Sequence, residues 1–332
     1  MTLYSSAGQV AETAREFVEE VLGGGVTLTQ VAGDASFRRY FRVEKGRESW
    51  ILMDAPPDKE DSHPFLDIAR FLRSHGVGAP EVLAERLDLG YVLLEDFGDL
   101  TYLKALEAGE DAQTLYRIAV DTLIALQATP VDGSCIAHHR PFDRAMLRRE
   151  LALFTDWYIE GICRTPIVPE DRLAFDAAFH RLLDGVLRQP WTLVHRDYHS
   201  RNLMWRQGQV GVIDFQDAVM GPITYDLASL LRDCYVAWER PFREQVMERW
   251  WQAPAIRARY AVDWNTFCTD LGWMGIQRNL KAVGIFGRLS LRDGKHGYLN
   301  DIPRTMGYVR AALSDYPELA DLSALIHRYA PE

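Results

Sequence analysis

The sequence has little cysteine and no motif built from it. The four cysteines are scattered without a C-x-x-C pair, at Cys135, Cys163, Cys234 and Cys268. This spacing argues against a zinc knuckle and against a disulfide framework, because both need closely spaced or paired thiols. Unpaired thiols are typical of a reducing compartment. We therefore expect free cysteines in a cytoplasmic protein.

Signals for export or for a membrane are also lacking. The N-terminus has no basic region followed by an apolar stretch, and no apolar run approaches the length that spans a bilayer. An excess of positive charge is absent as well, since 37 Lys and Arg against 47 Asp and Glu give a formal net charge of −10. Phosphate-rich partners require a basic face, so this charge argues against nucleic acid or an anionic membrane as a general partner.

What remains is the composition of an ordinary globular protein. Hydrophobic residues make up 48% and charged residues 25% of the chain. A length of 332 residues is enough for two lobes. There are no repeats or low-complexity tracts, and nothing in the sequence indicates an obligate protein partner.

The most informative segment is residues 195–202, which read HRDYHSRN, followed by Asp214 in the apolar frame VIDF. This is the H-R-D-x-x-x-x-N loop and the later metal-binding Asp of ATP-dependent phosphoryl transfer. Asp197 is the candidate base for an attacking hydroxyl. Asn202 and Asp214 offer the oxygen ligands that Mg2+ prefers. Short apolar runs precede both carboxylates, so we expect Asp197 and Asp214 at the ends of strands.

The histidines admit a second interpretation, which is weaker. His195 and His199 are four residues apart, but no glutamate or third ligand accompanies them as a zinc site requires. The pair His138 and His139 has no such context either. The phosphoryl-transfer motif already accounts for His195 and His199.

Hydrophobic periodicity predicts an α+β protein with a β-rich N-terminal part and a mainly helical C-terminal part. Strands are expected at residues 27–32, 40–44, 50–54, 81–84, 91–94, 191–194 and 210–213. Helices are expected at residues 10–22, 62–73 (capped by Ser62), 115–126, 142–158, 170–188, 225–237, 241–252, 263–285 and 304–313. This order predicts a bilobal protein-kinase-like fold. Its nucleotide-binding lobe would span residues 1–95, and its catalytic and acceptor-binding lobe would span residues 96–332.

The turn between the first two strands reads GDASF, and there a kinase needs backbone amides close to the ATP phosphates. The candidates are Gly33, Ser36 and Phe37. The turn is poor in glycine, and by itself an ordinary hairpin turn explains it better. Its position upstream of the catalytic loop favours the nucleotide role.

The third strand reads WILMD and lacks the lysine that protein kinases use to hold the α and β phosphates. Arg39 or Arg42 is the candidate replacement, although either could be part of a solvated basic strand face. In the connector after the fifth strand, Glu95 or Asp96 is the candidate to frame the adenine, and Phe97 is a further candidate to bind the nucleotide. Loss of the lysine is typical of a pseudokinase, but retention of both metal ligands and the base argues for turnover.

These segments resemble the aminoglycoside phosphotransferase and choline kinase superfamily. The resemblance rests on residues 193–204, on IDFQD at 213–217, on Gly221-Pro222 and on Asp226-Leu227-Ala228. Gln216 stands where protein kinases have the glycine of D-F-G. The segments GDASFRRY at 33–40, MDAPP at 53–57 and QRNLK at 277–281 are similar to the bacterial cell-wall amino-sugar kinases, which act on N-acetylmuramate and N-acetylglucosamine.

The resemblance implies ATP and Mg2+ as cofactors and a small amino sugar as the acceptor. It implies Asp197 as base, Asn202 and Asp214 as metal ligands, and Asp226 as an anchor of the catalytic loop. It also implies transfer to the anomeric hydroxyl, giving a sugar 1-phosphate in peptidoglycan recycling. Because that hydroxyl is more acidic than a simple alcohol, a carboxylate of ordinary pKa suffices as base.

The sequence says less about which residues contact the acceptor. Arg232, Gln277, Arg278 and Lys281 are candidate acceptor contacts, and each could equally be structural. Trp273 has the helical spacing of a core residue. Two alternatives stay open: another small-molecule kinase of the superfamily, acting on an aminoglycoside, choline or homoserine, and a nucleotide-binding module without turnover.

Overall fold

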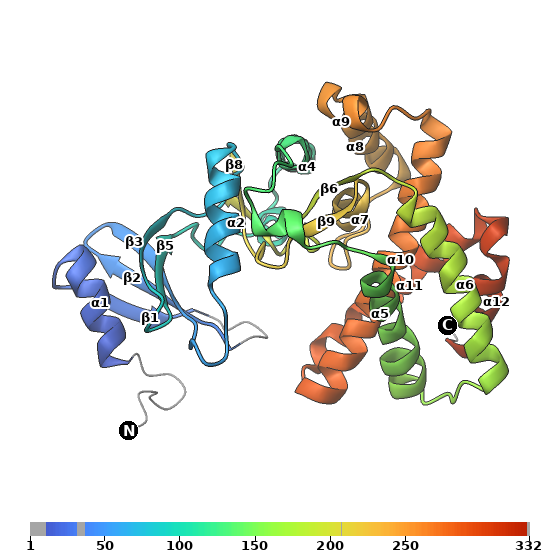
Figure 1. Ribbon diagram of the computed structural model, residues 1–332, viewed down its shortest axis with the longest axis horizontal. Helices are drawn as coiled ribbons and strands as arrows, with labels where there is room; N and C mark the ends of the chain where they lie inside the picture. Colours follow the sequence, from blue (N-terminus) through green and yellow to red (C-terminus); the bar gives the residue numbers. More distant parts are fainter. Residues whose placement is uncertain (1–10, 32–36, 207, 331–332) are drawn as a thin grey trace.

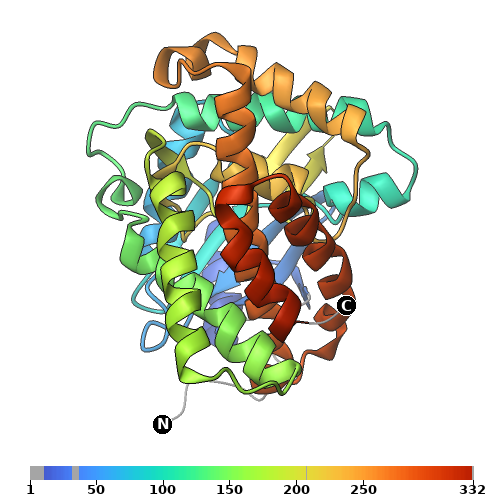
Figure 2. The same cartoon turned by 90° about the vertical axis from the view of Figure 1, so that its right-hand side faces the viewer.

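The computed structural model describes residues 11–31, 37–206 and 208–330. A small sheet with two flanking helices forms the N-terminal part, and a larger, mainly helical part follows it (Figure 1). Figure 2 views the molecule from the helical end, with the sheet behind. Within these ranges, no helix combines the length and the apolar character that crossing a bilayer would take.

The N-terminal sheet is antiparallel with the strand order β1-β2-β3-β5-β4. Its strands are β1 (Thr27–Gln30), β2 (Arg39–Lys45), β3 (Glu48–Asp54), β4 (Val82–Arg86) and β5 (Tyr91–Glu95). The three strands and the hairpin expected from the sequence are therefore confirmed, with ends shifted by at most two residues.

A different helix covers each face of this sheet, because neighbouring side chains of a strand point to opposite faces. Helix α1 (Glu12–Leu22) packs with Phe41 and Val43 of β2 in a small separate core. Helix α2 (His63–Ser74) lies on the other face, between the sheet and the C-terminal part (Figure 1). Its side chains join Met53 of β3 and the C-terminal helices in one continuous core. Ser62 is the N-cap residue and Pro64 lies in the first turn, as expected, but the Ser62 side chain accepts no capping hydrogen bond.

The C-terminal part carries two small antiparallel hairpin-like pairs that hold the catalytic segments. Strand β6 (Trp191–Val194) pairs with β9 (Val219–Pro222), and β7 (Leu203–Arg206) pairs with β8 (Gln209–Val212). The sequence predicted β6 and β8. It did not predict β7 and β9, which are four residues long.

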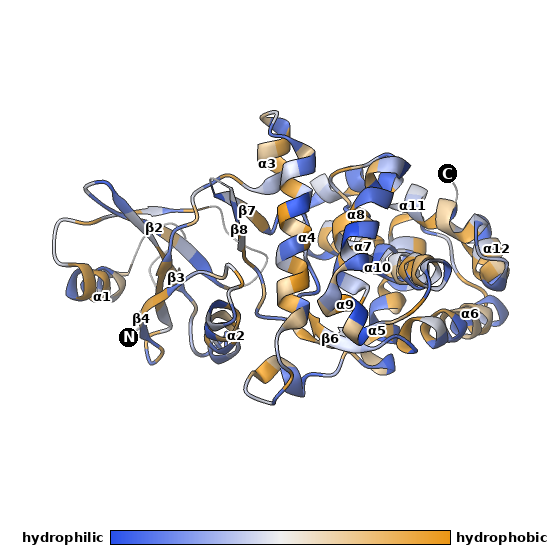
Figure 3. Ribbon diagram, turned by 90° about the horizontal axis from the view of Figure 1, so that it is seen from above, coloured by the Kyte–Doolittle hydropathy of each residue, from blue (hydrophilic) through white to orange (hydrophobic). Residues whose placement is uncertain are grey.

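Helices form the rest of this part, and Figure 3 shows polar and apolar stripes along several of them, such as α4. The helices that were not yet given are α3 (Tyr102–Glu107), α4 (Ala112–Ala128), α5 (Arg144–Leu153), α6 (Pro169–Leu187), α7 (Tyr225–Leu231), α8 (Arg240–Gln252), α9 (Pro254–Arg259), α10 (Trp264–Asp293), α11 (Ile302–Ser314) and α12 (Ala320–Tyr329). Short 3-10 turns lie at Ile136–His139, His296–Asp301 and Pro317–Leu319, and a π-helical segment at Phe154–Ile162.

Helix α10 is the central element, with 20 of its 30 residues buried. Asp263 caps its start by accepting a hydrogen bond from the Thr266 N–H, and Gly294 ends it in the left-handed conformation at φ 67°. Trp273 is buried as expected. The buried side chains also include Gln277, Arg278 and Lys281, which an apolar core would not contain without a polar partner.

Candidate active site

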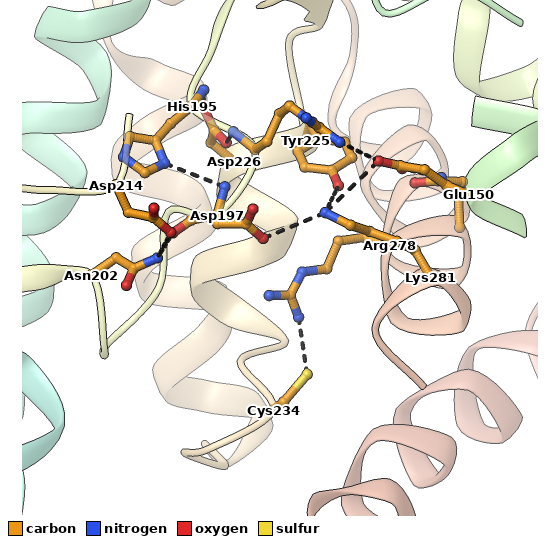
Figure 4. Close-up of polar contacts among 12 residues, drawn as sticks. Glu150, His195, Asp197, Asn202, Asp214, Tyr225, Asp226, Cys234, Arg278 and Lys281 are labelled. Carbon is orange, nitrogen blue, oxygen red and sulfur yellow. Dashed lines mark hydrogen bonds and ion pairs between the residues drawn. The ribbon is translucent and has the colours of Figure 1, made fainter. Parts of the chain in front are cut away.

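Strand ends place both predicted carboxylates. Asp197 follows β6 and Asp214 follows β8, and Asn202 lies between them (Figure 4). The Asn202 amide donates to the Asp197 carbonyl oxygen at 3.0 Å and to Asp214 Oδ2 at 3.1 Å. The spacing of the motif therefore brings its three candidate residues together.

The backbone of the catalytic loop is held in a conformation that side chains rarely adopt. Arg196 has φ 79° and Asp214 has φ 65°, and such positions cost on the order of 1–3 kcal/mol unless the surroundings impose them. Asp226, fully buried at the start of α7, accepts hydrogen bonds from the N–H groups of His195 at 2.7 Å and Arg196 at 3.0 Å. These bonds fix the turn that presents Asp197.

His195 links the two halves of the site. Its Nε2 donates to the Ile213 carbonyl oxygen at 2.9 Å, and its Nδ1 accepts from the Asp197 N–H at 3.3 Å. Burial lowers the pKa of His195 to about 4. The neutral ring, with its proton on Nε2, thus ties the base loop to the strand end before Asp214.

A buried lysine from α10 faces the candidate base. Lys281 Nζ lies 3.4 Å from Asp197 Oδ1, 3.3 Å from the Tyr225 hydroxyl and 3.8 Å from Glu150 Oε1 (Figure 4). Burial acts to raise the pKa of Asp197, but nearby charges, led by Lys281, hold that pKa well below its usual range. The Asp197 side chain is still 38% exposed, so an acceptor can reach it.

Glu150 of α5 completes this cluster, and sequence reasoning missed it. It is buried and pairs with Arg196 at 2.7 Å, and it accepts a hydrogen bond from the Gln277 amide at 3.1 Å. In the sequence Glu150 stands in a charged run, RRE, which looks like a solvated helix face. Only the packing of α5 on α10 reveals its place.

The other predicted acceptor residues lie further from the base. Arg278 donates from Nη1 to the Arg232 carbonyl oxygen at 3.3 Å and to Cys234 Sγ at 3.2 Å. The Arg232 side chain packs against Gly275 of α10, and the ionisable groups near it include Tyr316, Arg243 and Asp315. Arg232 therefore does not lie beside Asp197, whereas Lys281 does. Gln277 is connected to Lys281 through Glu150.

A cavity of about 310 Å³ runs between the sheet and the catalytic strands. Tyr40, Arg42 and Ile51 of the sheet form one wall. Glu95, Asp96 and Phe97 of the connector lie at its edge, and Asn202, Asp214 and Gln216 lie opposite the sheet. A cavity closed by a connector at one side and by oxygen ligands at another fits a nucleotide with its phosphates toward Asn202 and Asp214.

The predicted nucleotide residues fall into three groups. Arg42, Glu95 and Phe97 line the cavity. Arg39 alternates with Arg42 along β2 and pairs with Asp54, so it lies on the face of the sheet that α1 covers. Phe37 is 64% exposed, while Gly33 and Ser36 lie outside the described residues.

Neither candidate arginine is a simple substitute for the missing lysine. Arg39 cannot reach the cavity from its face of the sheet without breaking its pair with Asp54. Arg42 contacts Asp96 at 2.7 Å and Asp99 at 2.7 Å. These bonds tie β2 to the connector, and they raise the pKa of Arg42.

The side-chain oxygens at the strand ends fit a magnesium ion. Asn202 donates through its nitrogen, which leaves its carbonyl oxygen for a metal, and the Asp214 carboxylate lies beside it. Mg2+ is commonly bound by one or two protein oxygens, with nucleotide phosphates and water completing its shell. Gln216 donates to Asp214 Oδ1 at 2.8 Å and orients that carboxylate.

Known structures share this fold. An ADP-bound aminoglycoside phosphotransferase superposes with a TM-score of 0.62 at 14% identity, over 90% of this chain and 98% of that one. The match confirms the bilobal protein-kinase-like α+β fold. At this identity it shows the fold alone.

Sequence relatives are closer. A protein of Pseudomonas aeruginosa named N-acetylmuramate/N-acetylglucosamine kinase is 41% identical over 304 residues, which cover 90% of this chain and 87% of the relative. A protein of the same name from Neisseria meningitidis is 40% identical over 90% of this chain and 89% of the relative. The model of the phosphotransferase enzyme family matches residues 27–263. The chain therefore belongs to the phosphotransferase enzyme family.

Proposed function

We propose that the protein is an ATP-dependent amino-sugar kinase that phosphorylates the anomeric hydroxyl of N-acetylmuramate, N-acetylglucosamine or both. The product would be the sugar 1-phosphate, formed during recycling of cell-wall sugars. The observation that carries the proposal is the site around Asp197, Asn202 and Asp214 in a chain about 40% identical to kinases named for these sugars.

Asp197 is the proposed general base. The anomeric oxygen attacks the γ-phosphorus, the bond from that phosphorus to the bridging oxygen breaks, and ADP leaves. Asp197 accepts the proton of the hydroxyl late in this step, and Lys281 fixes the position of the carboxylate at 3.4 Å. Asn202 and Asp214 would hold Mg2+ on the phosphates, where it would neutralise developing charge.

The charge beside Asp197 favours this acceptor over an aminoglycoside. Arg196, Arg278 and Lys281 are all close enough to lower the pKa of Asp197. Among the carboxylates around these three cations, Glu150 pairs with Arg196 and Lys281, and Asp233 acts on Arg278. A polycationic acceptor would meet like charge at the base, whereas a neutral or acidic sugar would not.

The test is ATP consumption with a panel of acceptors, with phosphorus NMR to locate the phosphate. We expect turnover with the two amino sugars and a product without a free reducing end. Asp197→Asn should lower kcat by about a thousandfold. Asp321→Asn, on the exposed surface of α12, removes the same charge and is the matched control.

Three outcomes would contradict the proposal. Turnover only with choline, homoserine or kanamycin-like acceptors would place the protein elsewhere among small-molecule kinases. A product that keeps its reducing end would show that another ring hydroxyl accepts the phosphate. Tight ATP binding without turnover for any acceptor would indicate a nucleotide-binding module.

A further inference from the structure

An arginine of the catalytic loop lies over the face of an aromatic ring. The Arg201 guanidinium carbon is 3.6 Å from the centre of the Tyr235 ring and 5.7 Å from the centre of the Tyr298 ring. Tyr298 in turn stacks on Phe286 of α10, with ring centres 5.6 Å apart. The Arg201 side chain is nevertheless exposed. Stacking of this kind restricts the side chain while leaving the N–H groups at the edge of the guanidinium available.

The Arg201 guanidinium also differs from the other cations near the base in its partners. Arg196 pairs with Glu150, Lys281 with Asp197 and Glu150, and Arg278 binds Cys234 and a backbone oxygen. Within the described ranges, no carboxylate lies within 4.0 Å of Arg201. Burial raises the pKa of Asp301, and the charge of Arg201, acting from a greater distance, opposes this rise. Arg201 is thus an oriented cation with free donors.

Arg201 belongs to the same short loop as Asp197. It stands four residues after Asp197 and directly before Asn202, so an extended chain would separate Arg201 from Asp197 by at most about 14 Å. The loop is more compact than that, because the His199 N–H donates to the Asp197 carbonyl oxygen at 3.1 Å and the Asn202 N–H to the His199 carbonyl oxygen at 2.9 Å. The buried His199 ring packs edge-on against Tyr235, with ring centres 5.4 Å apart.

We infer that Arg201 binds the carboxylate of an acidic acceptor and so sets the preference between the two amino sugars. This inference rests on the proposed function. N-acetylmuramate differs from N-acetylglucosamine by a lactyl ether on C3 of the ring, two carbons from the anomeric carbon. A sugar with its anomeric hydroxyl at Asp197 would carry this carboxylate toward the outer part of the site. A guanidinium binds a carboxylate through two parallel hydrogen bonds, and its position on Tyr235 reduces the entropy lost on binding.

The experiment compares kcat/KM for both sugars in Arg201→Gln and in the unaltered protein. We expect the ratio of N-acetylmuramate to N-acetylglucosamine efficiency to fall by about tenfold to a hundredfold, the range for a hydrogen-bonded charge. Arg201→Lys keeps the charge but loses the planar fork, and should give an intermediate ratio. Arg240→Gln removes the same charge from the exposed start of α8, and should leave the ratio unchanged.

A modified acceptor tests the same contact without altering the protein. N-acetylmuramate with its lactyl carboxylate converted to the amide should lose most of its advantage in the unaltered protein. It should be affected little by Arg201→Gln. Both sugars phosphorylated with an unchanged ratio in Arg201→Gln would overturn the assignment of Arg201 and leave the proposed function standing. Phosphorylation of neither sugar by the unaltered protein would overturn the proposed function itself.

Discussion

Lys281 and Asp197 form an ion pair at the candidate base, and removing the ammonium has a defined effect on pH dependence. Lys281 lowers the pKa of Asp197, so in Lys281→Met the carboxylate should take up a proton at higher pH. The acid limb of the pH profile of kcat/KM should therefore move upward. We also expect kcat at neutral pH to fall by about tenfold to a hundredfold, because the carboxylate loses the contact that orients it.

Two further variants separate this effect from a general loss of charge. Lys281→Arg should restore part of kcat and the original acid limb. Lys104→Met, on the exposed face of α3, removes the same charge away from Asp197. An acid limb that stays in place in Lys281→Met, despite a lower kcat, would show that Lys281 acts only on the acceptor or the phosphates.

His195 makes the stability of the folded chain depend on pH. Its pKa falls from 6.5 to about 4 on folding because it is buried, so its contribution is present above about pH 6.5 and is lost as the pH falls toward 4. The full difference corresponds to about 3 kcal/mol, of which about 2 kcal/mol is lost by about pH 5. Urea titrations at about pH 7 and about pH 5 should show this loss, and His195→Gln should remove it.

Asp226 changes stability in the opposite direction over the same pH range. Its contribution must therefore be the same in the two proteins that are compared. Burial raises its pKa to about 7, against the two N–H donors that lower it. Its contribution to stability is therefore lost as the pH rises through 7. Because both proteins contain Asp226, the comparison of slopes isolates His195. Equal slopes in the two proteins would contradict the prediction.

At the scale of elements, two helical glycines should respond oppositely to the same substitution. A Cβ on Gly284 of α10 would lie 2.4 Å from the backbone carbon of Leu153, where α10 meets the end of α5. Backbone cannot yield cheaply, so Gly284→Ala should lower the free energy of unfolding by about 1–3 kcal/mol. A Cβ on Gly307 of α11 would meet nothing within 4 Å. Gly307→Ala should stabilise the protein by about 0.5–1 kcal/mol through helix propensity.

Thermal and urea unfolding of the two variants measure both effects with identical chemistry. The comparison removes any general advantage of alanine in a helix. If both variants shifted stability in the same direction, the close approach of α10 to α5 would not be what requires glycine at position 284.

The catalytic loop could be predicted from the sequence because its parts are local. Asp197 and Asn202 are five residues apart, and a short hairpin brings Asp214 back to them. The contact between Glu150 and Lys281 could not be predicted, because it depends on how α5 packs on α10. In α10 the buried polar residues follow the same spacing as the core residues around them, so periodicity alone cannot tell a site from a helix face.

The ends of several helices could not be predicted from the sequence either. The helix expected at residues 225–237 ends at Leu231, because Asp233 binds the Ser200 N–H and the Tyr235 N–H, both at 2.9 Å. The helix expected at residues 263–285 continues to Asp293 at the Gly294 cap. The one expected at residues 142–158 starts at Arg144 and becomes π-helical from Phe154. A partner from elsewhere in the fold decides where the first of these helices stops, and a glycine cap decides where the second stops.

At the scale of the whole molecule, one core joins the two parts that the sequence suggested as separate lobes. Phe65 of α2 stacks on Phe215, which directly follows Asp214, with ring centres 4.9 Å apart. Met53 of β3 and Leu94 of β5 belong to the same core as the C-terminal helices. Phe17 of α1 belongs instead to the small core on the outer face of the sheet. The boundary at residues 95 and 96 stays a prediction, and it divides a continuous apolar interior.

This continuity predicts that the chain unfolds in a single cooperative transition, with equal calorimetric and van't Hoff enthalpies. Phe65→Ala and Phe17→Ala should each lower stability by about 3–5 kcal/mol. Because the sheet, with α1 on its outer face, unfolds together with α2 and the C-terminal helices, both variants should move the same transition. Residues 96–332 alone would expose the surface that α2 covers, and should not melt cooperatively. A second transition that only Phe17→Ala shifts, together with a cooperative melt of residues 96–332, would show that the two parts fold independently.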